Sequence, residues 1–141
     1  MKNDIIKIGL IGCGRWGPNL IGSIRRIDGI EINHVADQNK FALENVRQRF
    51  PNLVTHENAL KVIESPVLDA VLISTPVETH LSLVELALKA KKHVFVEKPF
   101  GKSTSKCESL CSLAEKNNLQ IMVGHVFLFN ASILALKKII V

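Results

Sequence analysis

The stretch IIKIGLIGCGRWG, residues 5–17, decides the fold. It begins with an isoleucine-rich apolar run and passes directly into the pattern G-x-G-x-x-G at residues 12–17. A short apolar run that ends in glycine is typical of a strand buried on both faces of a parallel sheet. In such a pattern Gly12 allows a tight turn, Gly14 the close approach of a pyrophosphate, and Gly17 close packing of helix on strand. The following helix would present free N–H groups and a partial positive charge to the phosphates.

A second apolar run, residues 30–36, ends at Asp37, which lies 20 residues after Gly17. A carboxylate at the end of the second strand accepts hydrogen bonds from the ribose hydroxyls and repels a 2′-phosphate. The spacing therefore predicts a dinucleotide site that prefers NAD to NADP. The alternative is an ordinary turn in which Asp37 caps the next helix, but the order of strand, glycine loop and helix favours the dinucleotide site.

The rest of the chain alternates apolar runs with segments of helical period. Further apolar runs lie at residues 68–74, 93–96 and 120–123. Strands that alternate with helices of about 10–15 residues indicate βαβ units. The sequence predicts an α/β, Rossmann-like, doubly wound fold with a mostly parallel sheet and helices on both faces. The helical patterns cover residues 15–27 and 40–50, the apolar positions Leu81, Val84 and Leu88, and the positions Cys107, Leu110, Cys111 and Ala114.

Composition narrows the class of protein. The chain has 141 residues, of which 47% are hydrophobic and 22% charged. This length suits a single domain that buries about two-thirds of its unfolded surface. Three cysteines without framework spacing argue against a disulfide scaffold. No apolar run approaches the roughly 18–20 residues of a membrane span, and the first one is too short for a secretion signal. We expect a cytoplasmic protein without a membrane partner.

The charge balance is basic, with 18 Lys and Arg against 13 Asp and Glu. Six lysines lie between Lys89 and Lys106, a patch that could attract nucleic acid or a phosphorylated ligand. Three of them (Lys89, Lys91 and Lys92) also fit the end of a helix, where the dipole favours cations. Because aromatic residues make up only 5% and no recognition motif is present, we predict no nucleic-acid partner.

Two other motifs do not predict a binding site. The segment GKS at residues 101–103 lacks the upstream glycine of a phosphate-binding P-loop, because Val96 stands at that position. Cys107 and Cys111 are four residues apart but have no histidine or carboxylate pair at a suitable spacing, so they are better explained as apolar helix positions. No metal is predicted.

Polar residues follow three of the expected strands, and ligands of open α/β sheets bind at the carboxyl ends of strands. They are STP at residues 74–76 with His80 beyond, EKP at residues 97–99, and His125. Lys98 has a counter-charge beside it and could act as an acid or hydrogen-bond donor at a substrate hydroxyl. A solvated lysine that pairs with Glu97 is the alternative.

Taken together, these motifs resemble the N-terminal domain of the Gfo/Idh/MocA oxidoreductases. The resemblance rests on GCGRWGPN at 12–19, STP with His80, HVFVEKP at 93–99 and VGH at 123–125, and it covers essentially the whole chain. The segments WGPNL and VGHVF look most like the branch that oxidises nucleotide-linked amino sugars.

The resemblance implies hydride transfer between nicotinamide and a carbon that bears a hydroxyl of a sugar or nucleotide sugar. It makes Lys98 the catalytic residue, in contact with the reacting hydroxyl. It also implies that NAD, in preference to NADP, is held by Gly12, Gly14, Arg15, Trp16, Gly17, Asp37, Ser74, Thr75, Pro76, His80, Glu97, Lys98 and His125.

The resemblance also divides the chain. Residues 1–124 correspond to the dinucleotide-binding domain, and residues 125–141 to the start of a crossover into a second α+β domain that this chain lacks. Family members continue Phe-Asn-Pro where this chain has Ala131. We expect a homo-oligomer when the second domain is present, and little activity from the 141 residues alone. The alternative is a non-catalytic dinucleotide-binding module that acts through a partner docked on the apolar helix expected at residues 130–141.

Overall fold

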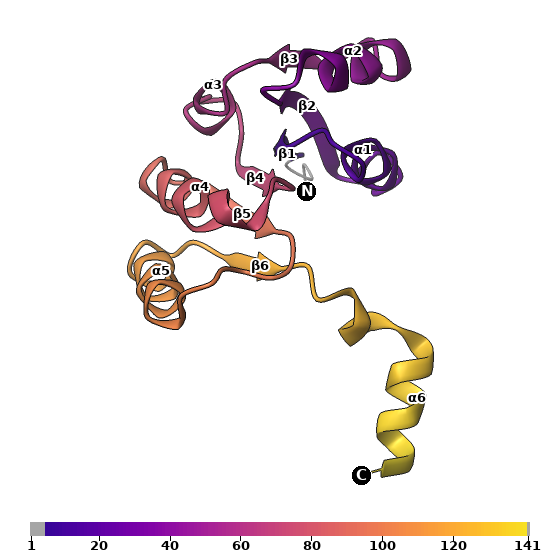
Figure 1. Ribbon diagram of the computed structural model, residues 1–141, viewed down its shortest axis with the longest axis vertical. Coiled ribbons are helices and arrows are strands. Elements are labelled where there is room, and N and C mark those ends of the chain that lie inside the picture. The colour runs from indigo at the N-terminus through magenta and orange to yellow at the C-terminus, as the bar shows by residue number, and fades with distance from the viewer. Residues whose placement is uncertain (1–4, 141) are drawn as a thin grey trace.

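The computed structural model describes residues 5–140, which form a six-stranded sheet with helices on both sides (Figure 1). Every pairing is parallel, in the order β3-β2-β1-β4-β5-β6. The predicted α/β, Rossmann-like fold is therefore confirmed. In chain order the elements are β1 (Ile6–Ile11), α1 (Gly17–Ile24), β2 (Ile30–Ala36), α2 (Lys40–Arg49), β3 (Val54–His56), α3 (Leu60–Ile63), β4 (Ala70–Ile73), α4 (Val77–Lys89), β5 (His93–Val96), α5 (Thr104–Lys116), β6 (Ile121–Val123), the 3-10 helix η1 (Val126–Phe129) and α6 (Ala131–Ile140).

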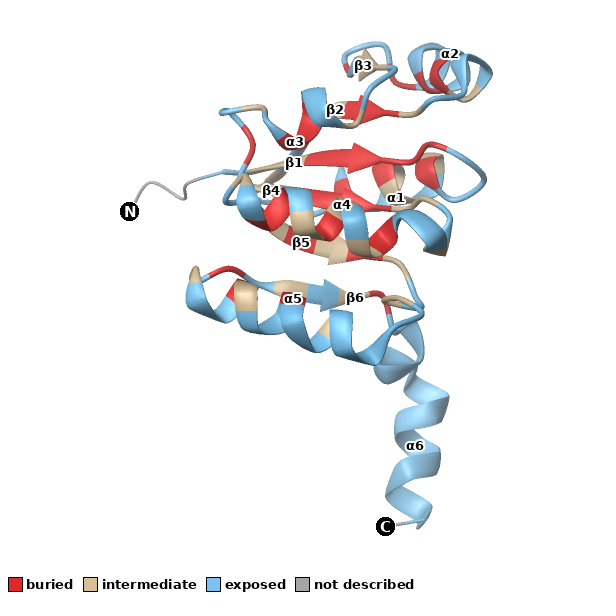
Figure 2. Cartoon of the chain, turned by 60° about the vertical axis from the view of Figure 1, so that its left-hand side comes forward, coloured by how far each residue is buried: buried red, intermediate tan, exposed pale blue. Residues whose placement is uncertain are grey.

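Alternating strand residues build one apolar layer on each face of the sheet. On one face Leu10 and Leu72 pack with the buried side chains of α1 and α2. On the other face Ile11 and Ile73 pack with those of α3, α4 and α5. Because both faces are covered, the carboxyl-terminal halves of the central strands β1 and β4 are buried, as their continuous apolar runs predict (Figure 2).

The strand order creates a switch point between β1 and β4. The chain runs outward from β1 to β2 and β3, then returns to build β4, β5 and β6 on the opposite side of β1. Ile11 pairs with Ala36 of β2 and with Ile73 of β4, so these three strands end at one level. Such a switch point leaves a crevice at the carboxyl ends of the strands, where open α/β sheets bind ligands.

Three details differ from the sequence prediction. The strand β3 and the helix α3 were not located, since they have only three and four residues. The first helix is shorter than the expected 15–27. It ends at Ile24, and the N–H of the C-cap residue Arg25 donates to the carbonyl oxygens of Ile21 and Ser23. Residues 25–29 form the turn that follows, and Gly29 has a φ of 80° there.

The last two elements lie apart from both apolar layers. Figure 1 shows α6 projecting away from the sheet beyond β6, and Figure 2 shows it exposed along its length. Neither η1 nor α6 contains a buried residue. The helix expected at residues 130–141 is present as α6, and Val141 lies outside the described residues. Across residues 5–140, no helix has both the length and the apolar character needed to cross a bilayer.

Candidate functional site

The crevice at the switch point is a cavity of about 390 Å³. Its walls come from the carboxyl ends of β1, β2 and β4, from the segment between β3 and α3, and from α4. Six of the residues singled out in the sequence lie close to one another here, and all of them line the cavity: Gly12, Gly14, Asp37, Ser74, Thr75 and Pro76.

The three glycines of the loop have different surroundings. Gly12 has a φ of 98°, and a Cβ there would lie 2.4 Å from the carbonyl oxygen of Ser74. A Cβ on Gly17 would lie 3.1 Å from the carbonyl oxygen of Gly12, so the start of α1 packs closely on the end of β1. Gly14 has open space where its Cβ would be, on the cavity wall. The loop therefore offers an unobstructed backbone surface at the position where a pyrophosphate approaches.

The N-terminus of α1 faces this loop without a side-chain cap. Trp16 is the N-cap residue and makes no capping hydrogen bond, Pro18 follows in the first turn, and that turn contains no acidic residue. The N–H of Gly17 donates to the carbonyl oxygen of Gly14 at 3.3 Å and the N–H of Asn19 to that of Trp16 at 3.0 Å. This helix end therefore attracts an anion mainly through the positive end of its dipole. Trp16 and Arg15 are exposed and do not line the cavity itself.

Asp37 joins the glycine loop to the start of α2. Its Oδ2 accepts a hydrogen bond from the N–H of Cys13 at 2.6 Å, and its Oδ1 accepts one from the N–H of Asn39 at 2.8 Å. Burial, and then the negative charge of Asp37, raise the pKa of the Cys13 thiol to about 12. The neutral thiol is thus part of the core, while the Asp37 carboxylate reaches the cavity.

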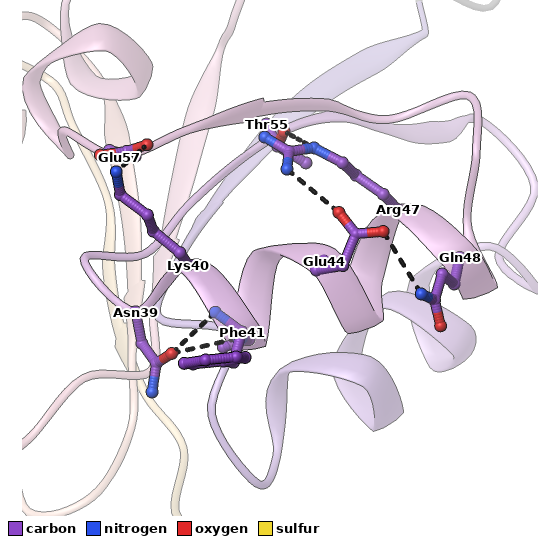
Figure 3. Close-up of polar contacts among 9 residues, drawn as sticks. Asn39, Lys40, Phe41, Glu44, Arg47, Gln48, Thr55 and Glu57 are labelled. Atoms are coloured by element: carbon purple, nitrogen blue, oxygen red, sulfur yellow. Dashed lines mark hydrogen bonds and ion pairs between the residues drawn. The ribbon is translucent and has the colours of Figure 1, made fainter.

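A second carboxylate lies at the same end of the cavity. Glu57, just after β3, lines the cavity and pairs with Lys40 at the start of α2, with 3.5 Å between Nζ and Oε1 (Figure 3). Arg47 of α2 donates from Nε to the hydroxyl of Thr55 at 2.8 Å, which ties α2 to β3. Asn39 caps α2 by accepting from the N–H of Phe41 at 2.9 Å.

The turn after β4 is fixed to the first turns of α4. The Thr75 and Thr79 hydroxyls lie 2.7 Å apart, and the Thr79 hydroxyl donates to the carbonyl oxygen of Pro76 at 2.7 Å. His80 is 1% exposed, and both of its ring nitrogens contact main-chain oxygens of this chain. His80 can therefore affect ligand binding only by positioning the backbone that its ring contacts.

Glu97, Lys98 and His125 lie at the carboxyl ends of β5 and β6, outside the cavity walls. Glu97 accepts the N–H of Lys98 at 3.3 Å and lies beside Gly124, whose Cβ would be 3.3 Å from Oε2 of Glu97. Lys98 is exposed, and the peptide bond to Pro99 is cis. Among the described residues Lys98 forms no ion pair, so the pairing with Glu97 that the sequence left open is not seen.

Three lysines of the basic patch between Lys89 and Lys106 form ion pairs with glutamates of α4. Lys102 pairs with Glu78, and Lys89 and Lys106 pair with Glu85 at 2.7 and 3.8 Å. These lysines hold the pKa of each glutamate below its ordinary value, mainly through side-chain hydrogen bonds. Lys92 is buried and donates to two main-chain oxygens. In the described part of the chain, no group of three or more His, Cys, Asp or Glu side chains could hold a metal ion.

Four polar residues of the cavity wall are not singled out by the sequence: Gln38, Glu57, Thr79 and Ser82. Gln38 directly follows Asp37, and its place in the crevice follows from that position. Glu57 follows the three-residue strand β3, whose position the pattern did not reveal. Thr79 and Ser82 are exposed positions of α4, and nothing in their spacing separates them from an ordinary solvent face.

A Rossmann sheet with an open glycine loop at the switch point and an acid after its second strand defines the class of dinucleotide-binding proteins. A family model described as "Oxidoreductase family, NAD-binding Rossmann fold" matches residues 6–125. The chain belongs to this family, the Gfo/Idh/MocA oxidoreductases.

Two of the named relatives are inositol dehydrogenases. The chain is 28% identical to myo-inositol 2-dehydrogenase of Thermotoga maritima, in a match that covers 94% of this chain and 40% of that protein. It is 25% identical to scyllo-inositol 2-dehydrogenase (NADP(+)) of Bacillus subtilis, over 99% of this chain and 38% of that protein. The chain thus spans about 40% of the length of these relatives.

A solved structure has the same fold with ligands bound. Scyllo-inositol dehydrogenase from Lactobacillus casei, with bound NAD(H) and scyllo-inositol, superposes with a TM-score of 0.87 at 28% identity. The match covers 96% of this chain and 40% of that one. The cofactor class of the family is therefore NAD(P), with both NAD and NADP among its members.

Proposed function

We propose that this chain is the cofactor-binding half of a dehydrogenase that moves a hydride between NAD and the carbon bearing a hydroxyl of a sugar or polyol. The observation that carries the proposal is the crevice itself, in which the open backbone at Gly14 and the carboxylate of Asp37 face one cavity. When bound, NAD supplies the hydride acceptor at C4 of its nicotinamide ring. The dinucleotide-binding domain is proposed to end at residue 124, with residues 125–141 leading toward the substrate-binding part.

Each part of the crevice has a proposed task. The N-terminus of α1 and Gly14 hold the pyrophosphate, and Asp37 holds the adenosine ribose. The two mononucleotide halves of the fold lie on either side of the switch point, so the nicotinamide half extends over β4, β5 and β6. Ser74, Thr75 and Pro76 border its path, and Glu97 and His125 lie at its far end.

Lys98 is the proposed catalytic residue. It is exposed at the carboxyl end of β5, where its ammonium group can donate a hydrogen bond to the oxygen of a substrate hydroxyl. That contact would orient the hydroxyl as its carbon gives up a hydride to C4 of the nicotinamide and its oxygen gives up a proton to water or to a base of the substrate-binding part. The relatives point to polyols and sugars as the substrate class, and the nucleotide-linked amino sugars suggested by WGPNL and VGHVF are the narrower prediction. A cytoplasmic location and homo-oligomers of the full-length enzyme stay predictions.

The preference for NAD is argued from charge. Asp37 and Glu57 place two carboxylates at the adenosine end of the crevice, and the nearby cation Lys40 pairs with Glu57. A 2′-phosphate would meet both negative charges there. Calorimetric titration of the 141-residue chain should give binding of NADH that is at least about tenfold tighter than that of NADPH.

The variant Glu57→Gln tests the charge argument. It removes one carboxylate and frees Lys40, so NADPH should bind about fivefold more tightly while NADH changes little. The matched double variant with Lys40→Met should lose that gain. Equal affinity for the two cofactors in the wild-type chain would contradict the proposed preference, and failure to bind either would contradict the proposed function.

The second candidate is a non-catalytic dinucleotide-binding module that acts through a partner. It is favoured by the exposed apolar side chains of η1 and α6, among them Phe127, Phe129 and Ile139. Exposed apolar surface of this kind marks interaction sites. A chain that stays monomeric and unaggregated at high concentration in size-exclusion chromatography with light scattering would count against this candidate.

A further inference from the structure

His80 lies at the carboxyl ends of two neighbouring strands without reaching the cavity. Its Nε2 is 2.8 Å from the carbonyl oxygen of Thr75, in the turn after β4, and its Nδ1 is 2.8 Å from that of Pro99, in the loop after β5. Both partners are acceptors, so the ring must donate; a neutral ring donates to one oxygen at a time and an imidazolium to both. The imidazole itself is buried, with 1% of the residue exposed, and both contacts are partly buried.

The two partners belong to different parts of the proposed site. Thr75 lines the cavity, whereas Pro99 directly follows Lys98. The strands before them are paired in register, with Ile73 opposite Val96. One imidazole thus spans the gap between the segment that borders the cofactor path and the segment that carries the proposed catalytic lysine.

The surrounding side chains of α4 strengthen this connection. Glu78 pairs with Lys102, and Leu81 packs so closely on Gly101 that a Cβ there would lie 2.6 Å from its side chain. Glu78, His80 and Leu81 therefore hold the loop after β5 at three points along its length. Of the three, only His80 also holds the turn after β4.

We infer that His80 is a positioning residue for the nicotinamide half of the cofactor, because its ring sets the spacing between the Thr75 turn and the Lys98–Pro99 segment. The inference rests on the proposed function. Removal of the ring nitrogens takes away the donor that these two partly buried contacts share, and the backbone must move for the carbonyl oxygens to find other partners. The adenosine half is held by Asp37 and the glycine loop, where the N–H of Gly12 donates to Ala36 and the N–H of Cys13 to Asp37. Binding of that half should therefore be insensitive to His80.

The experiment compares NADH with ADP-ribose, which lacks the nicotinamide ring, by calorimetric titration of the full chain. The variant His80→Phe keeps an aromatic ring and removes both nitrogens, and His80→Gln keeps a side-chain N–H donor. Lys92→Met is the matched control, because Lys92 is also buried and also donates to two main-chain oxygens, those of Ser65 and Leu68 at 2.8 and 2.6 Å. Lys92 directly precedes β5, at the opposite end of that strand from Lys98, so its loss should lower stability without changing the crevice.

We expect His80→Phe to weaken NADH binding about tenfold and to leave ADP-ribose binding within about twofold of the wild type. His80→Gln should recover part of the loss, and Lys92→Met should leave both affinities unchanged. The inference is overturned if His80→Phe weakens both ligands equally or neither, if Lys92→Met reproduces its pattern, or if wild-type NADH binds no tighter than ADP-ribose.

If the His80→Phe variant does not fold, a second measurement on the wild-type chain tests the same inference. In the wild type, the imidazole ¹⁵N signals of His80 should shift on addition of NADH and stay in place with ADP-ribose. Equal shifts with both ligands, or with neither, would overturn the inference. Binding of ADP-ribose without an effect at His80 leaves the cofactor site intact, whereas binding of neither ligand defeats the proposed function and this inference together.

Discussion

At the scale of single residues, the crevice depends on a few side chains whose partners are main-chain groups. Asp37 accepts from Cys13 and Asn39, and His80 contacts the carbonyl oxygens of Thr75 and Pro99. Such contacts order the backbone that lines the crevice before any ligand is present. An ordered site loses less conformational entropy on binding than a flexible one.

A histidine pair at the edge of the sheet should make stability depend on pH. Nδ1 of His34 in β2 lies 3.1 Å from Nε2 of His56 in β3, and the two rings are stacked. Burial, then the neighbouring His34, then Lys61 lower the pKa of His56 below its ordinary value of 6.5. As the pH falls through about 6.5, the unfolded chain takes up a proton at this position before the folded chain does. The free energy of unfolding should therefore decrease on acidification.

Urea unfolding at pH 7.5, 6.5 and 5.5 measures this slope. The variant His56→Asn should show a smaller decrease than the wild type across the same interval, because it removes the titrating group. An identical decrease in the two proteins would mean that the pair does not contribute to the pH dependence.

Several site residues could be predicted from the sequence, and others could not. Asp37 and the glycines can be predicted because they directly follow two long apolar runs, which mark the ends of two buried strands. The sequence places His80 just beyond the fourth strand, but the direction of its ring depends on Pro99, which lies 19 residues later and meets it only in the folded chain. Glu57 could not be found, because its place in the crevice depends on the short edge strand β3.

At the scale of elements, the loop between β1 and α1 separates a structural task from a binding task. Gly12 has a positive φ and packs against Ser74, whereas Gly14 borders open space. The same sequence pattern therefore contains one glycine required by the fold and another that we propose the ligand requires.

Alanine at these two positions should separate the two tasks. Gly14→Ala should leave the free energy of unfolding within about 0.5 kcal/mol of the wild type and weaken NADH binding about tenfold or more, because the new methyl group occupies the approach of the pyrophosphate. Gly12→Ala should destabilise the chain by about 2 kcal/mol or more, since its φ and its contact with Ser74 both disfavour a Cβ. Chemical denaturation and calorimetry provide the two readouts. A large loss of stability in Gly14→Ala would contradict this division.

The longer elements could be predicted and the shortest could not. Five of the six strands and the helices α1, α2, α4, α5 and α6 correspond to patterns in the sequence. A strand of three residues and a helix of four contain too few positions for a period of 2 or 3.6 to be recognised. The sequence pattern predicts a first helix that extends to residue 27, but α1 ends at Ile24 because a turn occupies residues 25–29.

At the scale of the whole molecule, the sheet and its two apolar layers are complete without η1 and α6. Those last elements keep their apolar side chains exposed, and none of their residues lines the crevice. The proposed cofactor site therefore lies entirely within the residues that the family model matches, 6–125. Binding of NADH should be a property of this part of the chain.

The central claim is that NADH lies across the switch point, with its adenosine half at Asp37 and its nicotinamide half toward β5. Amide NMR of the 141-residue chain during titration with NADH tests it most directly. We predict shifts at residues 12–17, at Asp37 and Gln38, at Ser74 and Thr75, and at Lys98, with η1 and α6 unchanged. Shifts centred elsewhere, such as on residues 89–92 just before β5 at the amino ends of the strands, would contradict the account. So would the absence of shifts at saturating NADH.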